Sequence, residues 1–230
     1  MHEVRLSLLL QSGNVMERAS VPIRHTTIAG WTGRDRAAVE RHIEELAALG
    51  VKRPTSVPSF YRIASARVTT NSSIEVLGDS SSGEVEFVLF EYAGKLWLAV
   101  GSDHTDRTVE TFSVDVSKQI CDKPIARVCW LFDDVAPHWD SLILRSRVGA
   151  EQTLYQEGSV ATLLRPAELI SQLTENGTVP EKTMMFCGTL PVIGGIRPAP
   201  EFAFELDDPI LGRKICHQYQ IRTLPMCCQL

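Results

Sequence analysis

The chain has 230 residues, of which 44% are hydrophobic and 22% charged, and its formal net charge at pH 7 is -5. This composition fits one globular core and excludes a disordered or fibrous protein. The negative net charge, without a run of lysines or arginines, indicates that neither nucleic acid nor an anionic membrane is a partner. Small molecules and other proteins remain as candidate partners.

No targeting or membrane segment is predicted. The apolar run at 4–10 contains Arg5 and is followed by no small-residue cleavage site, so it predicts a strand and not a signal peptide. No apolar stretch reaches the roughly 20 residues that a membrane-spanning helix needs. We therefore expect a cytoplasmic protein.

The cysteines predict neither a zinc site nor a disulfide framework, because no C-x-x-C pair and no regular spacing occurs among them. We expect them to be scattered thiols. The six are Cys121, Cys129, Cys187, Cys216, Cys227 and Cys228.

Two helices and a series of strands are predicted along the chain. The first helix covers 36–49, where apolar residues recur at helical spacing between Asp35 as the N-cap and Gly50 as the stop. A proline-spaced connector follows. From about residue 67, short β-type runs are separated by turn residues, and a proline opens a second helix near 166–175. The predicted strand runs are 84–92, 95–101, 126–131, 141–147, 183–188, 201–206 and 213–223.

Strands that do not alternate regularly with helices predict a mixed α+β fold, β-rich in its second two thirds. We expect a single domain over 1–230, in which residues 1–62 form an N-terminal lobe that carries the helix at 36–49. The polar stretch between the strand runs, from 102 to 126, is predicted as a long loop. Long connections in compact domains are often functional.

Two glutamates, Glu84 and Glu86, stand one residue apart at the head of the strand run 84–92, which otherwise has the composition of a buried strand. Side chains at i and i+2 of a strand share a face, so the two carboxylates project side by side. Like charges in that arrangement repel each other and need an explanation.

The two residues at 93–94, Ala-Gly, join this run to the next one and predict a β-hairpin. Counting back from the loop puts Asp103 opposite Glu84 on the same face. It puts Gly101, which leaves room for a side chain, opposite Glu86. A hairpin loop of odd length would instead turn Asp103 to the other face.

Three converging carboxylates have three open explanations: a bound cation, raised pKa values, or strand ends exposed to solvent. An all-oxygen ligand set favours a hard ion such as Mg²⁺, Mn²⁺ or Ca²⁺ over zinc. His104, which follows Asp103, is a candidate further ligand or proton shuttle, and the alternatives are a residue that supports the ligands or a surface residue.

Three motifs together resemble the fumarylacetoacetate hydrolase superfamily. They are the E-x-E of GEVEF at 83–87, the segment GSDHTDR at 101–107, and CGTLPVIGG at 187–195. The resemblance covers most of the chain and implies a β-rich roll or sandwich with a few peripheral helices, assembled as a homodimer.

In that superfamily the E-x-E glutamates and a following aspartate hold a divalent ion. The resemblance therefore implies that Glu84, Glu86 and Asp103 are metal ligands for Mg²⁺ or Mn²⁺, with Ca²⁺ as a further option.

The resemblance also implies residues that contact the substrate. Arg107 occupies the place of the family's arginine after the aspartate, and Lys118 matches its active-site lysine, with Lys123 as the alternative. The GTLP stretch is similar to a substrate-lining loop, which implies roles for Gly188 and Thr189.

Two further roles are implied in the same way. YQEG at 155–158 is similar to a family stretch with a glutamine, which implies that Gln156 is a substrate-binding residue. HIEE on the first helix matches the H-x-x-E whose pair activates water, so the resemblance implies that His42 and Glu45 form the general base. The helix at 36–49 is a candidate lid that would close over the site when substrate binds. From spacing alone, the same pair also fits a solvated helix rim.

The resemblance implies a metal-dependent hydrolase or lyase that cleaves a C–C bond next to the carbonyl of a small oxo-acid, by acylpyruvate-type hydrolysis or 2-oxo-acid decarboxylation, through a metal-stabilised enolate. An isomerase, hydratase or aldolase with the same site is one alternative, and a non-catalytic binding protein that kept the fold is another. Ser102 stands where the family has asparagine, and the family's Asn-Tyr before the histidine is missing. We therefore expect a divergent branch.

Overall fold

The computed structural model describes residues 3–48 and 53–225. Its strands are β1 (Val4–Ser12), β2 (Val15–Ile23), β3 (His25–Gly30), β4 (Ser59–Ile63), β5 (Val68–Thr69), β6 (Ser73–Leu77), β7 (Ser81–Ser82), β8 (Val85–Tyr92), β9 (Lys95–Ser102), β10 (Thr105–Asp106), β11 (Lys123–Pro124), β12 (Val128–Leu131), β13 (Ile143–Val148), β14 (Thr153–Ser159), β15 (Thr183–Thr189), β16 (Glu201–Asp208) and β17 (Arg213–Leu224). Its α-helices are α1 (Arg36–Ala48), α2 (Arg107–Glu110), α3 (Val114–Gln119), α4 (Phe132–Val135) and α5 (Pro166–Leu173). The 3₁₀ turns are η1 (Ser65–Arg67), η2 (Ala136–Ser141) and η3 (Val160–Thr162).

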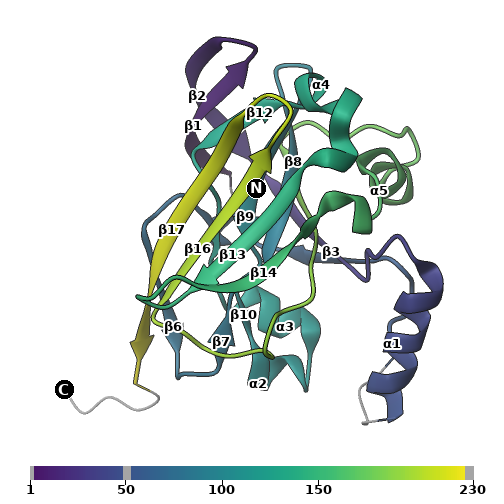
Figure 1. Ribbon diagram of the computed structural model, residues 1–230, viewed down its shortest axis with the longest axis vertical. Coiled ribbons are helices and arrows are strands. Elements are labelled where there is room, and N and C mark those ends of the chain that lie inside the picture. The colour runs from purple at the N-terminus through teal and green to yellow at the C-terminus, as the bar shows by residue number, and fades with distance from the viewer. Residues whose placement is uncertain (1–2, 49–52, 226–230) are drawn as a thin grey trace.

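Two sheets form the body of the molecule. The larger has eight strands in the order β2-β1-β12-β9-β8-β15-β3-β4, and the smaller has five in the order β14-β13-β16-β17-β6. In Figure 1 the smaller sheet crosses in front of the larger, and the helices lie at the edges. The mixed, β-rich α+β fold expected from the sequence is confirmed, and each predicted strand run contains a strand.

Apolar side chains fill the space between the sheets. Phe87 and Leu89 of β8 share one core cluster with Phe202 and Phe204 of β16. The opposite face of β8 belongs to a second cluster, which combines side chains from both ends of the larger sheet because that sheet curls around them. Val85–Phe90 are therefore buried on both faces, which explains the nearly continuous apolar run.

Both predicted helices are present. The carboxylate of Asp35 accepts hydrogen bonds from the backbone N–H groups of Ala37 and Ala38, as an N-cap does. The predicted end of α1 at residue 49 and the stop at Gly50 lie outside the described residues. No helix in the described ranges is long and apolar enough to cross a membrane.

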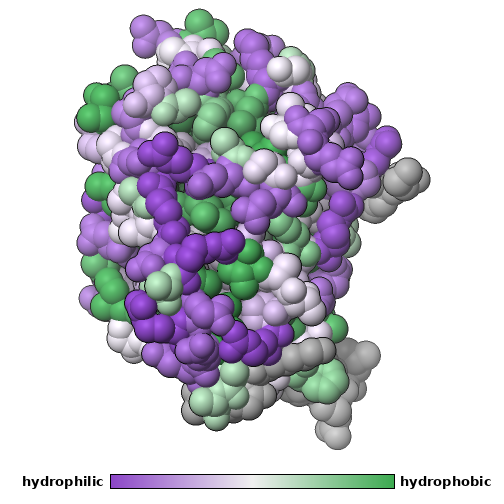
Figure 2. Space-filling view, turned by 90° about the vertical axis from the view of Figure 1, so that its right-hand side faces the viewer, coloured by the Kyte–Doolittle hydropathy of each residue, from purple (hydrophilic) through white to green (hydrophobic). Residues whose placement is uncertain are grey.

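The N-terminal segment supplies β1–β4, half of the larger sheet, whereas α1 stands apart from the sheets (Figure 1). The face of the molecule that carries α1 is mixed in character, with hydrophobic residues scattered among hydrophilic ones (Figure 2). Among the described elements of this segment, α1 alone stands out from the body of the molecule.

The prediction of a long polar loop between 102 and 126 is wrong. This segment contains β10, α2, α3 and β11, and several of its polar side chains, including those of His104 and Lys123, are fully buried. Hydrophobic periodicity does not detect elements of two to six residues whose buried side chains are polar and bond to one another.

The described cysteines are free thiols: Cys121, Cys129 and Cys187 are buried, and Cys216 is exposed. No disulfide joins them, in agreement with the sequence analysis. Cys227 and Cys228 lie outside the described residues.

Candidate metal centre

The β8–β9 hairpin has the register that the sequence predicts. Tyr92 pairs with Lys95, and Glu86 pairs with Gly101. Beyond the paired residues, the backbone N–H of Asp103 donates to the carbonyl oxygen of Glu84 at 3.0 Å. Asp103 therefore lies opposite Glu84, as expected.

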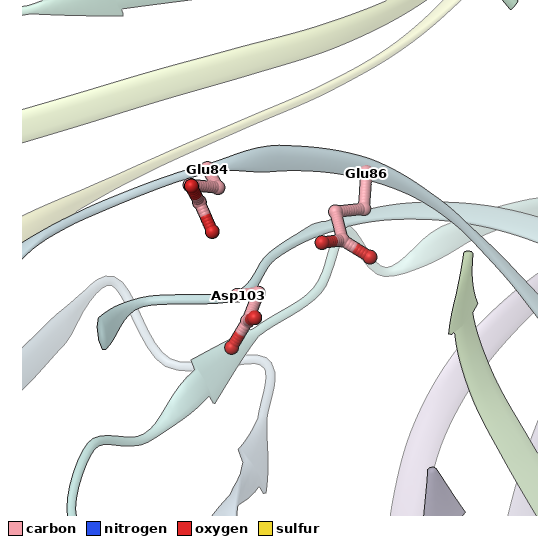
Figure 3. Close-up of side chains that lie close together, drawn as sticks. All are labelled: Glu84, Glu86 and Asp103. Atoms are coloured by element: carbon pink, nitrogen blue, oxygen red, sulfur yellow. The ribbon is translucent and has the colours of Figure 1, made fainter. Parts of the chain in front are cut away.

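This register brings the carboxylates of Glu84, Glu86 and Asp103 together. One oxygen from each lies within 4.8 Å of the others (Figure 3), and no other group of acidic, histidine or cysteine ligands is found among the described residues. Glu86 is 2% exposed and Asp103 is fully buried. Three converging carboxylate oxygens, two of them from buried residues, fit a hard divalent ion.

Glu86 is fixed by the backbone of a distant segment. The N–H of Gly188 donates to its carboxylate at 2.7 Å. Burial first, and then the nearby charge of Asp103, raise the pKa of Glu86 well above its usual value. A bound divalent ion would oppose this shift, because its positive charge would favour the ionised form of both carboxylates.

The expectation that Gly101 leaves room beside Glu86 is wrong. A Cβ atom at Gly101 would lie 2.8 Å from the Phe186 ring and 2.9 Å from the Ile125 side chain. The glycine therefore serves close packing between β9 and its neighbours.

Two lysines contact the carboxylate of Asp103, one at each oxygen. Lys118 binds Oδ2, and the Nζ of Lys123 lies 3.3 Å from Oδ1. Burial alone would raise the pKa of Asp103, but these two positive charges outweigh it and lower the pKa. Asp103 is therefore ionised and able to act as a ligand.

The two lysines differ in their surroundings. The Nζ of Lys123 is enclosed and also donates to the carbonyl oxygens of His104, at 2.6 Å, and Cys121, at 3.1 Å, and burial lowers its pKa. For Lys118, burial also disfavours the charged form, but Asp103 and nearby glutamates raise the pKa. Lys118 retains 8% exposure and lies 5.8 Å from the centre of the Tyr61 ring. Of the two, Lys118 is the one at the edge of the site.

Arg107, the first residue of α2, contacts Glu84 of the candidate centre. Its guanidinium donates to Ser82 Oγ at 2.7 Å and to Glu110 at 2.9 Å, and it lies 3.2 Å from the carboxylate of Glu84. Burial would lower the pKa of Arg107, but Glu84 and Glu110 raise it. Ser82 and Glu110 carry no sequence signal that would have identified them.

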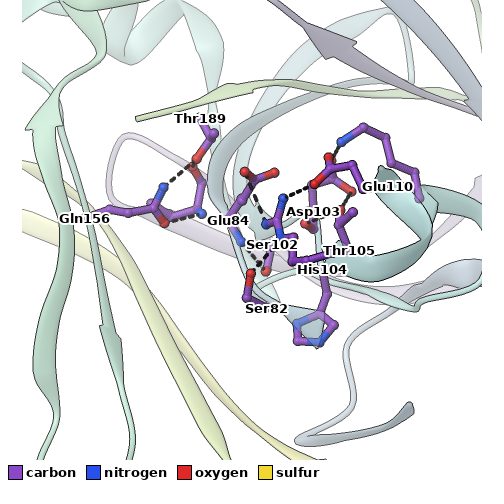
Figure 4. Close-up of polar contacts among 12 residues, drawn as sticks. Ser82, Glu84, Ser102, Asp103, His104, Thr105, Glu110, Gln156 and Thr189 are labelled. Carbon is purple, nitrogen blue, oxygen red and sulfur yellow. Dashed lines mark hydrogen bonds and ion pairs between the residues drawn. The ribbon is translucent and has the colours of Figure 1, made fainter. Parts of the chain in front are cut away.

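Gln156 is fully buried and all four of its hydrogen-bonding positions are used. Its Oε1 accepts from the backbone N–H of Val85 and from Ser146, at 2.9 and 2.8 Å. Its Nε2 donates to Thr189 Oγ1 at 2.7 Å (Figure 4). It also donates to the carbonyl oxygen of Leu190 at 2.7 Å. This saturation suits a residue that positions the site, and direct substrate contact is not expected from it.

Thr189 is half-buried beside Gln156. Its hydroxyl accepts the bond from Gln156 and donates to the carbonyl oxygen of Val85 at 2.9 Å. Through these contacts the end of β15 is held against the start of β8.

His104 does not point at the carboxylates. Figure 4 shows its ring directed away from Asp103, and its two nitrogens lie 2.9 Å from Tyr219 Oη and 2.9 Å from Ser81 Oγ. Burial lowers the pKa of His104 to about 3, so the imidazole is neutral. It therefore supports the segment and is not placed as a ligand.

His42 and Glu45 lie on α1, which Figure 1 shows apart from β10 and α3. Glu45 is exposed, and the side chain of His42 lies outside the described part of the structure. The arrangement therefore does not bring α1 to the carboxylates.

Replacing Gly188 by alanine is expected to destabilise the protein by about 3 kcal/mol or more. Gly188 has φ +98, and an added Cβ would lie 1.7 Å from Thr32 Oγ1, so the backbone that holds Glu86 would have to move. Denaturant unfolding measures the loss. Gly195→Ala is the control, since Gly195 also has a positive φ, of +83, but has open space around it; a loss of only about 1 kcal/mol is expected there. Equal losses in both variants would show that the close approach has no energetic weight.

The sequence was compared with protein families and with known proteins. A family model described as "Protein of unknown function (DUF2848)" matches residues 29–219, most of the chain. No match was found among curated proteins.

Several solved structures have a similar fold at low sequence identity. Yeast ynq8, a fumarylacetoacetate hydrolase family protein, is 14% identical, with a TM-score of 0.61 over 90% of this chain and 96% of that one. 2-Keto-3-deoxy-D-arabinonate dehydratase, complexed with magnesium and 2,5-dioxopentanoate, is 16% identical, with a TM-score of 0.62 over 92% and 78%. Maleylpyruvate hydrolase from Sphingobium sp. SYK-6, in complex with manganese(II) ion and pyruvate, is 12% identical, with a TM-score of 0.58 over 90% and 77%.

The fold is that of the fumarylacetoacetate hydrolase superfamily, in agreement with the resemblance found in the sequence. The family-model match over residues 29–219 shows that the chain belongs to the DUF2848 family.

Proposed function

We propose that this protein is a divalent-metal-dependent enzyme that cleaves a C–C bond next to the carbonyl of a small oxo-acid, by hydrolysis or decarboxylation. The observation that carries the proposal is the group formed by Glu84, Glu86 and Asp103, with ligand oxygens within 4.8 Å of one another and with cationic side chains beside it. The metal ions and oxo-acids named in two of the proteins of similar fold support it.

Glu84, Glu86 and Asp103 would hold the ion, as Mg²⁺ or Mn²⁺, with Ca²⁺ as a further option. When bound, a divalent ion would chelate adjacent substrate oxygens and, as a Lewis acid, stabilise the negative charge that develops on them during C–C cleavage. The buried pair Glu86 and Asp103 suits this use, because their charges attract a cation strongly where water is excluded.

Lys118 and Arg107 would supply positive charge to the substrate carboxylate or to the developing oxyanion. Lys118 is assigned the substrate-facing role in place of Lys123, because the Nζ of Lys123 is enclosed by backbone oxygens. Arg107 also holds Glu84 in place through their contact at 3.2 Å.

Thr189 would line the substrate site at its half-buried edge. Gly188 would fix Glu86, to which its N–H donates, and Gln156 would position Thr189 through the bond to its hydroxyl. In this assignment Gly188 and Gln156 act through the residues that they hold.

His42 and Glu45 would activate the attacking water: His42 takes a proton from it, and Glu45 orients the imidazole. This role requires α1 to close over the carboxylates when substrate binds, as lids do in many enzymes.

His42→Ala is expected to lower the rate of hydrolytic C–C cleavage by about 10²–10⁴-fold, the usual contribution of a general base. The affinity for Mn²⁺ should stay unchanged, because His42 is not a ligand in this proposal. Arg41→Ala, an exposed neighbour on α1, is the control and should keep the full rate. If cleavage by His42→Ala stays near the full rate, water activation by His42 is rejected.

A second outcome at the same site is favoured by two observations. α1 stands apart from β10 and α3, and one protein of similar fold is a dehydratase. An isomerase, hydratase or aldolase would use the same carboxylates and the same ion without His42. Product analysis with a substrate that turns over distinguishes C–C cleavage from these reactions.

A panel of acylpyruvates, oxaloacetate and related 2-oxo acids, with Mg²⁺ or Mn²⁺, tests the proposed reaction. Turnover of at least one compound that depends on the ion, and its loss in Glu86→Gln, is the expected result. No turnover together with no ion binding would favour a non-catalytic binding protein that kept the fold. A homodimer is proposed from the sequence resemblance alone, and light scattering tests it. A cytoplasmic location is proposed because the sequence shows no targeting segment.

A further inference from the structure

Tyr219 reaches the candidate metal centre from the smaller sheet. It lies in β17, is 1% exposed, and packs its ring against that of Phe202 with 5.7 Å between centroids. Its hydroxyl lies 2.9 Å from Ser102 Oγ and 2.9 Å from His104 Nδ1. These two residues flank Asp103, so one hydroxyl contacts both neighbours of a candidate ligand.

The same contacts extend to a second candidate ligand. The backbone N–H of Glu84 donates to Ser102 Oγ at 3.3 Å, and His104 Nε2 lies 2.9 Å from Ser81 Oγ. One assignment of protons satisfies the whole chain of bonds. Glu84 N–H donates to Ser102, Ser102 donates to Tyr219, and Tyr219 donates to His104. The second ring nitrogen of His104 then donates to Ser81.

The Tyr219 hydroxyl is thus placed behind the ligands and not among them. In extended backbone the side chains of Ser102 and His104 point away from that of Asp103. In the segment 102–104, the Asp103 carboxylate therefore faces the candidate ion site, and the Tyr219 hydroxyl contacts the side chains on the opposite face. Because the ring is fixed in the core between the sheets, the hydroxyl is a rigid anchor.

We propose that Tyr219 is a positioning residue of the metal centre, whose hydroxyl sets the spacing between the carboxylates of Glu84 and Asp103 through Ser102 and His104. The inference rests on the proposed function, since it assigns a role toward the same ion. Neither the sequence motifs nor the family resemblance assigns a role to this tyrosine.

Tyr219→Phe tests the inference because it removes only the hydroxyl and keeps the ring in the core. Groups that hold metal ligands from behind typically change metal affinity by about 10–100-fold when they are removed. We expect the Kd for Mn²⁺, titrated alone without substrate and followed by EPR of the free ion, to rise by about 10-fold.

Tyr155→Phe is the matched control. Tyr155 is also fully buried and packs against Phe202, but its hydroxyl accepts only a 3.4 Å bond from the backbone N–H of Arg197. Its Kd for Mn²⁺ should stay within about twofold of the wild-type value. If Tyr219 had only a structural role, Tyr219→Phe would lower the unfolding temperature and leave the Kd of the folded protein for Mn²⁺ unchanged.

Ser102→Ala provides a second route to the same answer, and it is measured in place of Tyr219→Phe if that variant does not fold. It breaks the link between Tyr219 and the N–H of Glu84 and should also raise the Kd. The double variant should weaken binding no more than the stronger single change, because both act through one chain of bonds.

The outcomes separate this inference from the proposed function. Tight Mn²⁺ binding by wild type, weaker binding by Tyr219→Phe and unchanged binding by Tyr155→Phe supports it. Equal Kd values for wild type and Tyr219→Phe, or equal weakening by Tyr155→Phe, overturns the positioning role and leaves the metal centre intact. No binding by wild type overturns both.

Discussion

Asp103→Asn is expected to abolish Mn²⁺ binding and to lower the free energy of unfolding by about 3–5 kcal/mol. Asp103 is the counter-charge of Lys118 and Lys123, and both lysines are buried. Without the carboxylate, two positive charges remain in the interior with no anion in contact at that position. Denaturant unfolding and Mn²⁺ titration measure the two effects.

Asp208→Asn is the control for the stability effect. Asp208 is also fully buried and contacts two basic side chains, His138 at 2.9 Å and Arg213 at 3.3 Å, but it is not part of the carboxylate group. A loss of stability with unchanged ion affinity is expected. If Asp103→Asn still binds Mn²⁺ as the wild type does, Asp103 is not a ligand.

Glu86→Gln is expected to change ion binding and stability in opposite directions. Ion binding should be lost, because the amide cannot supply a negatively charged ligand. The ion-free protein should become more stable at pH 7, by about 1 kcal/mol or more, because a buried charge beside Asp103 is removed. Glutamine also keeps an oxygen that can accept the bond from Gly188.

The pH dependence of this gain has a definite sign. The pKa of Glu86 is raised in the folded protein above its usual 4.5. Such a group destabilises the fold above its unfolded pKa and ceases to do so as the pH falls below that value. The stability difference between Glu86→Gln and wild type, measured in EDTA, should therefore shrink from pH 7 toward pH 4.

Glu91→Gln on the same strand is the control for this variant. Its carboxylate accepts a bond from Gly94 at the hairpin loop and lies outside the carboxylate group. Ion affinity should be unchanged in Glu91→Gln.

The contrary result for Glu86→Gln is a protein that is less stable than wild type in EDTA. It would show that the charge of the buried Glu86 carboxylate does not destabilise the ion-free protein.

Local sequence patterns predicted much of the fold. The Ala-Gly loop fixed the register of β8 against β9, and with it the position of Asp103 opposite Glu84. The strands β2–β7, β10, β11 and β14 were not predicted. β4 lies within the stretch interpreted as a proline-spaced connector, and β14 reads polar because part of it faces solvent.

The part of the site that the sequence could not supply depends on contacts between distant segments. No pattern distinguishes Lys118 from Lys123, since the difference is the enclosure of one Nζ by backbone oxygens. Tyr219 lies on the last strand, and only the packing of the two sheets brings its hydroxyl to Ser102.

Equilibrium binding of Mn²⁺ to wild type and Glu86→Gln, with thermal unfolding of both at the same ion concentrations, tests the metal centre most directly. Wild type should bind one ion per chain and gain about 2.7 kcal/mol of apparent stability when the ion concentration is 100 times Kd. Glu86→Gln should show neither effect. Absence of binding to wild type at millimolar ion, or equal binding by both proteins, would contradict a metal centre formed by Glu84, Glu86 and Asp103.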